Sequence, residues 1–424
     1  MSTHFDLQPV HPGGRRVLAP FRIREYRLLI TAVSLSIFAE GMWAVVMALQ
    51  VIELDNNPTS LSLVATCLGA GLVGFVLIGG IAADRLNQRS IIIAVETVNV
   101  VTVTAVAVLG SLGALRIWHM AVAAGTLGIA AAFFFPAYSA ILPRILPPEQ
   151  LLAANGVEGV VRPVFQRAVG PAVAGVVVGA TMPFVGAVTV AVLFAVGLVL
   201  LVATRPAVAP RDEAVERPHV LRDMRDGFTF VVGTPWLLAT LLFASLWVLV
   251  VLGPMEVLLP FVAQDRFHDG ARSYGFILAF FGIGSALGAL AVSSRRMPRR
   301  YLTVMMTVWG LGCLPLVVVG TTSSFGWMAL AIFVVGVTDG AGTVIWGTLL
   351  QRRVPTAMLG RVSSLDFFVS LAFMPVSFAI VGPLSKVVSM EVVFTVAGIV
   401  PVFIGLAAWL LARMRRDEIG HPLS

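Results

Sequence analysis

The sequence predicts an all-α membrane protein with 12 transmembrane helices arranged in two six-helix halves. Hydrophobic residues make up 58% of its 424 residues and charged residues only 12%, whereas a soluble domain carries about 25% charged residues. Apolar stretches of about 20 residues recur along the chain, and a helix of that length crosses a hydrocarbon core of about 30 Å. The basic residues gather in every second gap, as they do when a chain threads back and forth with Lys and Arg on the cytoplasmic side.

The apolar stretches define the predicted membrane spans. In chain order these are Leu28–Ile52, Leu61–Ala83, Ile91–Leu115, Ile117–Leu142, Val157–Ala180, Phe184–Ala203, Trp236–Val262, Tyr274–Val292, Leu302–Gly320, Trp327–Leu350, Leu365–Leu384 and Val392–Ala412. Only Arg116 separates the third span from the fourth, so the count depends on the distribution of charge. One helix fewer or more would scatter the basic residues over both sides of the membrane.

The basic residues fix the predicted topology. Most of the 29 lie before the first span or after an even-numbered span, and the gaps on the other side hold only Arg116, Arg266, Arg272 and Lys386. This asymmetry places both termini in the cytoplasm and the chain in the cytoplasmic (inner) membrane as a multi-pass protein.

A long polar connector divides the predicted spans into six plus six. The stretch from Arg205 to Asp226 mixes arginines with acidic residues, as a solvated linker does. The predicted organisation is therefore a cytoplasmic segment at 1–27, an N-terminal half at 28–204, a linker at 205–233, a C-terminal half at 234–412 and a cytoplasmic tail at 413–424. Two halves of this kind are typical of a large class of secondary transporters.

Composition also argues against several functions. The net charge of +7 reflects the membrane topology, because no basic cluster is interleaved with stacking aromatics, and nucleic acid is not an expected partner. Cys67 and Cys313 lie inside apolar spans without a CxxC motif, so we expect buried thiols and neither a metal site nor a cofactor. No nucleophile–base pair appears in any loop, which disfavours an enzyme.

The gap between the second and third spans carries the most specific motif. Its sequence, GIAADRLNQR from Gly80 to Arg89, resembles the motif of the major facilitator superfamily at the same gap. We expect Gly80 to let two helices approach closely, and Asp84 to pair with a cation or a helix N-terminus of the other half. With Arg85 and Arg89 these residues would form a cytoplasmic latch that holds the outward-facing state.

A second resemblance covers most of the chain. It is similar to the drug-antiporter branch of that superfamily, which includes the enterobactin exporter and macrolide efflux proteins, at Phe135-Pro136-Ala137, Pro143 to Pro147, Leu151 to Asn155, Gly170-Pro171, Gly175, Gly360-Arg361-Val362 and Gly382-Pro383-Leu384. The resemblance implies proton-coupled export of amphiphilic small molecules. We expect the protein to be a monomer in contact with membrane lipids. The glycine run of the fifth span departs from the antiporter pattern, with Ala174 in place of a glycine and Gln166 upstream.

Acidic residues inside the apolar spans are the candidate mechanistic groups. These are Glu40, Glu96, Glu256, Asp339 and Asp366. A charged acid at mid-bilayer costs at least about 2.5–3.5 kcal/mol, so each should face protein or a wet cavity. A carboxyl that alternates between an apolar environment and a nearby cation can take up and release a proton.

Glu40 is the strongest of these candidates because Trp43 and Met47 follow it on the same helix face. Aromatic and soft apolar walls around one acid suit a hydrophobic, often cationic, substrate. The resemblance implies that helices 1, 7 and 10 line the central cavity, which adds Glu256 and Asp339 to the proton-coupling or substrate-binding set.

The remaining intramembrane acids have structural interpretations. We expect Glu96 to partner the turn at Asp84 and Arg85, and Asp366 to cap its helix or pair with Arg361. Arg167 is a further member of the proton-coupling or substrate-binding set. It lies deep in the fifth span and needs an acid or a carbonyl, for which Glu40 and Glu158 are both open.

The sequence thus favours a secondary transporter that exports amphiphilic small molecules or drugs by alternating access, driven by proton entry. Within transport, the alternative is a dedicated exporter of an endogenous metabolite such as a siderophore or a lipid. A non-transporting membrane scaffold or sensor is a further alternative, against which the acids in helices 1, 7 and 10 argue.

Overall fold

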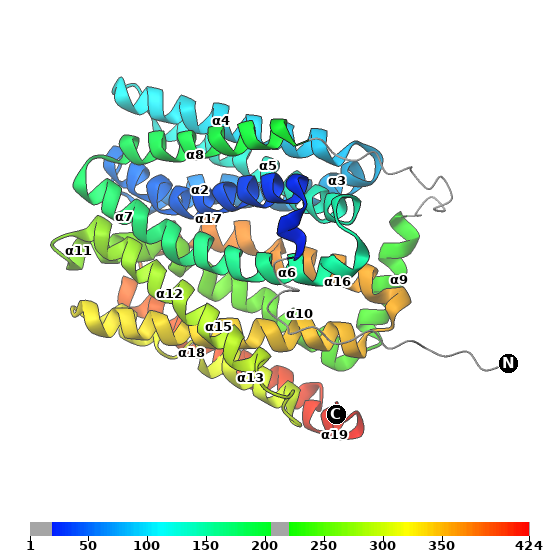
Figure 1. Cartoon of the computed structure of the whole chain (residues 1–424). Coiled ribbons are helices and arrows are strands. Elements are labelled where there is room, and N and C mark those ends of the chain that lie inside the picture. Colours follow the sequence, from blue (N-terminus) through cyan, green and yellow to red (C-terminus); the bar gives the residue numbers. More distant parts are fainter. Residues whose placement is uncertain (1–18, 205–219, 424) are drawn as a thin grey trace.

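The protein is an elongated bundle of long helices that lie roughly side by side (Figure 1). The computed structural model describes residues 19–204 and 220–423. Within those ranges the side chains of Asp84, Pro148, Leu152, Thr356, Ala357 and residues 220–224 are not described. The described residues contain 12 helical segments that are long and apolar enough to cross a membrane, which confirms the predicted number.

The first six spans are formed by eight helical elements. They are α2 (Arg24–Leu54), α3 (Pro58–Arg85), α4 (Gln88–Ser111), α5 (Ile117–Ile145), the continuous run of α6 (Pro148–Arg162), η2 (Pro163–Val169) and α7 (Gly170–Ala180), and α8 (Pro183–Ala203). The fifth span therefore starts nine residues before its predicted beginning at Val157, and its middle element, η2, is a π-helix.

The last six spans contain more interruptions than the first six. They are the run of α10 (Pro235–Trp247), η3 (Val248–Leu252), η4 (Pro254–Leu258) and α11 (Leu259–Arg266), then α12 (Gly270–Ser293), α13 (Tyr301–Leu311) with α14 (Leu316–Thr321), α15 (Phe325–Arg353), α16 (Thr356–Ala372) with α17 (Met374–Leu384), and α18 (Met390–Leu411). Both η3 and η4 are π-helices, and they lie in the middle of the seventh span.

Proline and asparagine mark the starts of several spans. Pro58, Pro183 and Pro235 occupy the first helical position, where a missing N–H costs nothing. The side chain of Asn57 accepts a hydrogen bond from the backbone of Thr59 and so caps α3.

Glycines allow the closest helix pairs to form. A Cβ at Gly71 of α3 would lie 2.5 Å from the carbonyl oxygen of Gly125 on α5, and one at Gly288 of α12 would lie 1.9 Å from that of Val337 on α15. Small residues bring backbones together in this way in membrane proteins. The pairs α3 with α5 and α12 with α15 are accordingly the most extensively packed in the described part of the molecule.

The packing fits two six-helix halves. In the first half α2 and α4 pack on α8, and in the second α10, α13 and α14 pack on α18. The main contacts between the halves are those of α3 with α17 and of α12 with α7 and η2. In contrast, α3 makes only a slight contact with α16, which is the other part of the eleventh span.

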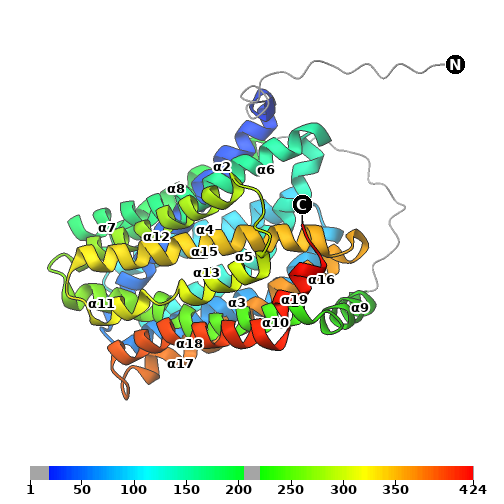
Figure 2. The ribbon, with the colours of Figure 1, turned by 90° about the horizontal axis from the view of Figure 1, so that it is seen from below.

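The two ends of the bundle therefore differ. We call the end that carries α9 (Val220–Val232), α16 and α19 (Met414–Gly420) the linker end, and the end that carries α7, α11 and α17 the far end (Figures 1 and 2). The halves are joined at the far end and separate towards the linker end.

Three elements at the linker end, η1, α9 and α19, lie outside the predicted spans. Helix α9 packs on α16, where the Asp226 carboxylate lies 3.2 Å from the Arg361 guanidinium. Asp366, which we expected to cap its helix or pair with Arg361, instead accepts hydrogen bonds from Trp346 and Ser370 at 3.0 and 3.2 Å. A short 3-10 helix, η1 (Ala19–Arg22), precedes α2.

Helix α19 is docked on the second half. Glu418 is 1% exposed, and it accepts hydrogen bonds from the backbone N–H and the hydroxyl of Thr303 at 3.1 and 2.6 Å. Asp417 lies 2.5 Å from the guanidinium of Arg353, which also stacks over the ring of Trp236. The residues predicted as a tail thus include a packed helix.

Candidate functional site

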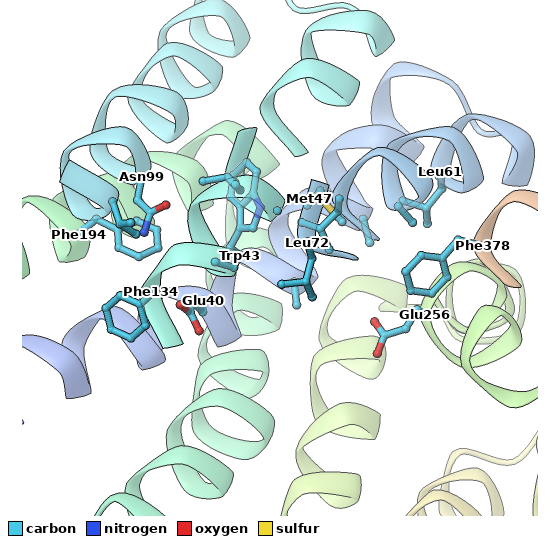
Figure 3. A pocket seen from close by; sticks show the side chains of 18 residues that line it. Glu40, Trp43, Met47, Leu61, Leu72, Asn99, Phe134, Phe194, Glu256 and Phe378 are labelled. Carbon is cyan, nitrogen blue, oxygen red and sulfur yellow. The ribbon is translucent and has the colours of Figure 1, made fainter. Parts of the chain in front are cut away.

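A cavity of about 210 Å³ lies among the helices of the bundle, and Figure 3 shows the side chains that line it. Its walls come mainly from α2, α3, α4, α5 and α8 of the first half, and the second half contributes Glu256 and Phe378. Glu40 and Glu256 are the two charged side chains among its described lining residues, and no Lys, Arg or His is among them. The other lining side chains are apolar except for Asn99.

Glu40 lies on α2 and is held by the fifth span. The side-chain amide of Gln166 donates a hydrogen bond of 2.8 Å to its Oε2 atom. The neighbouring Gly41 makes this possible, because a Cβ there would lie 2.5 Å from the backbone oxygen of Gln166. The guanidinium of Arg162 also attracts the Glu40 carboxylate, although it pairs directly with Glu158 at 3.0 Å.

Glu256 reaches the cavity from the opposite half. It lies in the π-helix η4, two residues after Pro254, which removes a backbone N–H from the middle of the seventh span. Its side chain is exposed to the cavity, whereas the residues on either side of it, Met255 and Val257, are buried. Figure 3 shows the carboxyl groups of Glu40 and Glu256 at separate positions on the wall.

Arg167 forms an ion pair between the halves. Its guanidinium lies 3.2 Å from the carboxylate of Asp339 on α15, and it also acts electrostatically on Glu256. The partner of Arg167 is therefore neither of the two acids, Glu40 and Glu158, that the sequence left open. The pair connects η2 with the tenth span close to the place where α12 packs on η2.

The expectation that helices 1, 7 and 10 line the cavity is only partly met. Helices α2 and η4 contribute Glu40 and Glu256, but α15 supplies none of the described lining residues. Asp339 faces Arg167 instead, because the rotation of α15 about its axis is set by the glycines that pack on α12. Asp339 thus belongs to the contact between the halves and not to this wall.

Aromatic side chains form much of the remaining wall. Trp43 and Met47 line the cavity one and two turns after Glu40, as their spacing on the helix predicted. Sequence reasoning did not single out Phe134, Phe194 or Phe378, which also line it. Phenylalanines are common in every span, and no sequence signal distinguishes those that face a cavity from those that face lipid.

Glu96 has different surroundings from those that its sequence position suggested. It is fully buried in α4, and neither of its carboxyl oxygens has a hydrogen-bond partner among the described residues. Its polar neighbours are Ser36, Glu40 and Asn99 rather than the turn at Arg85. The helix extends inward from Gln88, so Glu96 lies two turns inside the bundle and faces α2.

The arrangement combines an apolar and aromatic chamber with two acids from different halves. The described residues contain no group of three His, Cys, Asp or Glu side chains that could hold a metal ion. The sequence model of the Major Facilitator Superfamily matches residues 29–372 of this chain. The chain belongs to the Major Facilitator Superfamily.

Several relatives of the chain are described as efflux proteins. The chain is 28% identical to the multidrug efflux pump Tap of Mycolicibacterium fortuitum over 391 residues, which cover 89% of this chain and 94% of Tap. It is 24% identical to the enterobactin exporter EntS of Escherichia coli over 358 residues, 80% of each chain. These likenesses confirm the resemblance to the drug-antiporter branch and identify a transporter.

A solved structure supports the same fold. The nucleoside transporter NupG, crystallised as a single-residue mutant, superposes with a TM-score of 0.73 over 91% of this chain and 99% of its own, at 13% sequence identity. The likeness extends over both halves, so the observed bundle has the major facilitator fold.

The superfamily motif between the second and third spans lies at the linker end. Arg89 donates a hydrogen bond of 2.9 Å to the carbonyl of Val202 at the end of α8. Asp84 lies one residue before the end of α3, and its side chain is outside the described part. A Cβ at Gly80 would meet nothing within 4 Å in this structure, so the expected close approach is not made in this state and the role of Gly80 in the latch stays a prediction. Gly79, one residue and about 100° away, is the glycine that packs on α5.

Proposed function

We propose that this superfamily member is a proton-coupled secondary transporter that exports lipophilic, preferentially cationic, small molecules from the cytoplasm by alternating access. The observation that carries the proposal is the cavity, in which two carboxyl groups and no basic side chain stand among apolar and aromatic walls. Carboxylates and aromatic faces both attract a desolvated organic cation. The 28% identity to a multidrug efflux pump supports the direction of transport.

The proposed orientation places the linker end in the cytoplasm. Most of the basic residues lie in segments at that end, where the positive-inside rule puts them. Both termini and α9 would then be cytoplasmic, and the observed structure, with its halves joined at the far end, would be an inward-facing state. The cavity would receive substrate from the cytoplasm or the inner leaflet.

The acids give this cycle its proposed coupling. In the inward-facing state a cationic substrate would compete with protons for Glu40 and Glu256, so its binding would release a proton to the cytoplasm. After the halves rock, protonation from outside would neutralise the same carboxyls and expel the cation. One elementary charge that crosses 100 mV supplies about 2.3 kcal/mol, so exchange of a single proton provides useful work.

A second candidate function is the export of one endogenous metabolite, which the 24% identity to the enterobactin exporter favours. The cavity makes an anionic metabolite the less favoured cargo, because two carboxylates without a cation would repel it.

Transport in proteoliposomes tests the proposal. The purified chain is reconstituted, a pH gradient is imposed, and the movement of tetraphenylphosphonium, a neutral lipophilic dye and a catecholate siderophore is compared with protein-free liposomes. We expect uphill movement of the cation that a protonophore abolishes. Movement of the siderophore alone would support the metabolite exporter, and no movement of any probe would overturn both functions.

A further inference from the structure

Two Gly-Pro pairs lie within helices of the second half, and the glycine of each pair is buried. Gly253-Pro254 lies in the seventh span and Gly382-Pro383 in the eleventh. A proline inside a helix removes one backbone hydrogen bond and strains the turn before it. In a regular helix the N–H of each glycine would donate to the carbonyl four residues earlier. In both helices a serine hydroxyl from another helix is inserted between these two groups.

The first inserted serine is Ser377 on α17. The N–H of Gly253 donates to its Oγ atom at 2.9 Å, and the hydroxyl donates to the carbonyl of Leu249 at 2.8 Å. Ser377 is 2% exposed. Its hydroxyl thus takes the place of the bond from Gly253 to Leu249, at the junction between the two π-helices η3 and η4.

The second inserted serine is Ser62 on α3, and it crosses between the halves. The N–H of Gly382 donates to its Oγ atom at 2.8 Å, and the hydroxyl donates to the carbonyl of Phe378 at 2.6 Å. Ser62 is also 2% exposed. A Cβ at Gly382 would lie 2.3 Å from the Ser62 Oγ atom, so only glycine leaves room for the insertion.

The two insertions are continuous through α17. Ser377 and Phe378 are adjacent residues of α17. The turn of α17 into which Ser62 inserts is therefore the same turn that bonds to the seventh span through Ser377. Phe378 itself lines the cavity, and Glu256 follows Gly253 by less than one turn. A side chain that enters a helix ladder kinks the helix, and a π-helical turn can rewind to an α-helical one.

We propose that Ser62 and Ser377 are positioning residues that couple closure of the far end to the placement of Glu256 in the cavity. Opening of the far end withdraws Ser62 from α17, and the bond from Gly382 to Phe378 forms. The resulting shift of α17 weakens the hydrogen bonds of Ser377 to Gly253 and Leu249, so the π-helical turns of the seventh span rewind to α-helix. Each residue that leaves the bulge rotates Glu256 about the helix axis by roughly 100°. Glu256 enters this coupling as the cation-binding group of the proposed function, on which the inference rests.

Spin-label distances test the first step. Labels on Asn56→Cys and Val387→Cys, two exposed far-end positions, are measured by pulsed electron resonance in a background that carries Cys67→Ala and Cys313→Ser. Loss of the bridging hydroxyl in Ser62→Ala should raise the ratio of far-end-open to far-end-closed molecules about threefold to tenfold. Thr66→Val is the matched control, because its hydroxyl donates within α3 to the Ser62 carbonyl at 2.6 Å and does not cross the halves.

Binding measurements test the second step. Ser377→Ala should weaken binding of tetraphenylphosphonium about threefold to tenfold although Ser377 does not line the cavity. Ser62→Ala should weaken it as well, and the double variant should bind like Ser377→Ala alone. Additive effects, or a Ser62→Ala variant that opens the far end but binds the cation as Thr66→Val does, would overturn the coupling.

The test separates this coupling from the proposed function. If the wild-type chain binds no cation, the proposed function fails, and the reaction rate of a Glu256→Cys thiol with a charged methanethiosulfonate still reports the position of that residue. A changed rate in the Ser62→Ala background supports the coupling, and an unchanged rate refutes it. Elution as a single symmetric peak in detergent checks that each variant is folded.

Discussion

The replacement Glu40→Gln tests the central role of the cavity acid on α2. The substitution keeps the size of the side chain, and Gln166 can still donate its amide N–H to the new carbonyl oxygen, which replaces a carboxylate contact of 2.8 Å. We expect the variant to fold normally, because removal of a charge from a membrane span relieves a cost. What it loses is the attraction for a cation in the cavity.

The magnitude follows from Coulomb's law. A carboxylate and a cation about 5 Å apart attract each other by about 3 kcal/mol at an effective dielectric constant of about 20. Glu40 is only partly buried, so water in the cavity reduces this value by up to about one half. We therefore expect Glu40→Gln to raise the Kd for tetraphenylphosphonium between about 10-fold and 100-fold.

The assay is equilibrium binding to the purified chain in detergent, followed by transport in proteoliposomes. Glu53→Gln is the matched control, because Glu53 lies on the same helix and accepts a bond of the same length, 2.8 Å, from the amide of Gln50, outside the cavity. Proton-driven export should fail in Glu40→Gln, and downhill exchange should survive if Glu40 handles only the proton. A Kd within about twofold of that of the control, together with unaltered pH dependence of transport, would refute this reasoning and pass the role to Glu256.

Three further outcomes are expected. Asp84→Asn should weaken the linker-end latch and raise the accessibility of cysteines in the cavity from the cytoplasm; unchanged accessibility with normal transport would exclude the latch. Either Arg167→Asp or Asp339→Arg alone should lower the far-end-closed population about twofold to fivefold, because the two side chains pair across the halves at 3.2 Å. The double exchange should restore that population. A double variant that does not restore it in spin-label measurements would show that the pair does not hold the far end closed. Protease should cleave within 205–226 only in inside-out vesicles, and cleavage in right-side-out vesicles would invert the proposed topology.

The sequence predicted the spans well because length and hydropathy are local properties. The predicted sixth span, Phe184–Ala203, differs from α8 by one residue. Several other helices continue past their apolar stretch into charged residues, as α15 does to Arg353. The helix α9 was not predicted, since its polar face resembles a solvated linker, and its fit depends on Gly227 lying against Arg361.

The candidate site was harder to predict because it depends on how each helix is rotated about its axis. Trp43 and Met47 could be assigned with Glu40, since residues on one helix share a face by spacing alone. The partners Gln166 and Asp339 could not, because pairing between helices depends on which glycines allow close approach. For the same reason the sequence did not single out Gly79, which packs on α5 in this structure, since a shift of one position moves a side chain by about 100°.

The π-helices of the fifth and seventh spans were beyond sequence reasoning. Pro254 predicts a disturbed helix, but a proline in a membrane helix can produce a kink, a bulge or a water-filled gap. The choice here depends on the hydroxyl of Ser377, which belongs to a different helix and is far away in the sequence.

The docking of α19 has a consequence for the biosynthesis of the chain. Asp417 and Glu418 complete the surroundings of Arg353 and Thr303, which belong to spans inserted into the membrane earlier. Domains fold during synthesis in the order in which they leave the ribosome. The second half therefore cannot finish its packing at the linker end when its last span is inserted. It reaches its final form only after residues 414–420 have also emerged, because until then the guanidinium of Arg353 lacks the carboxylate of Asp417 and keeps only its contacts with Tyr301 and Trp236.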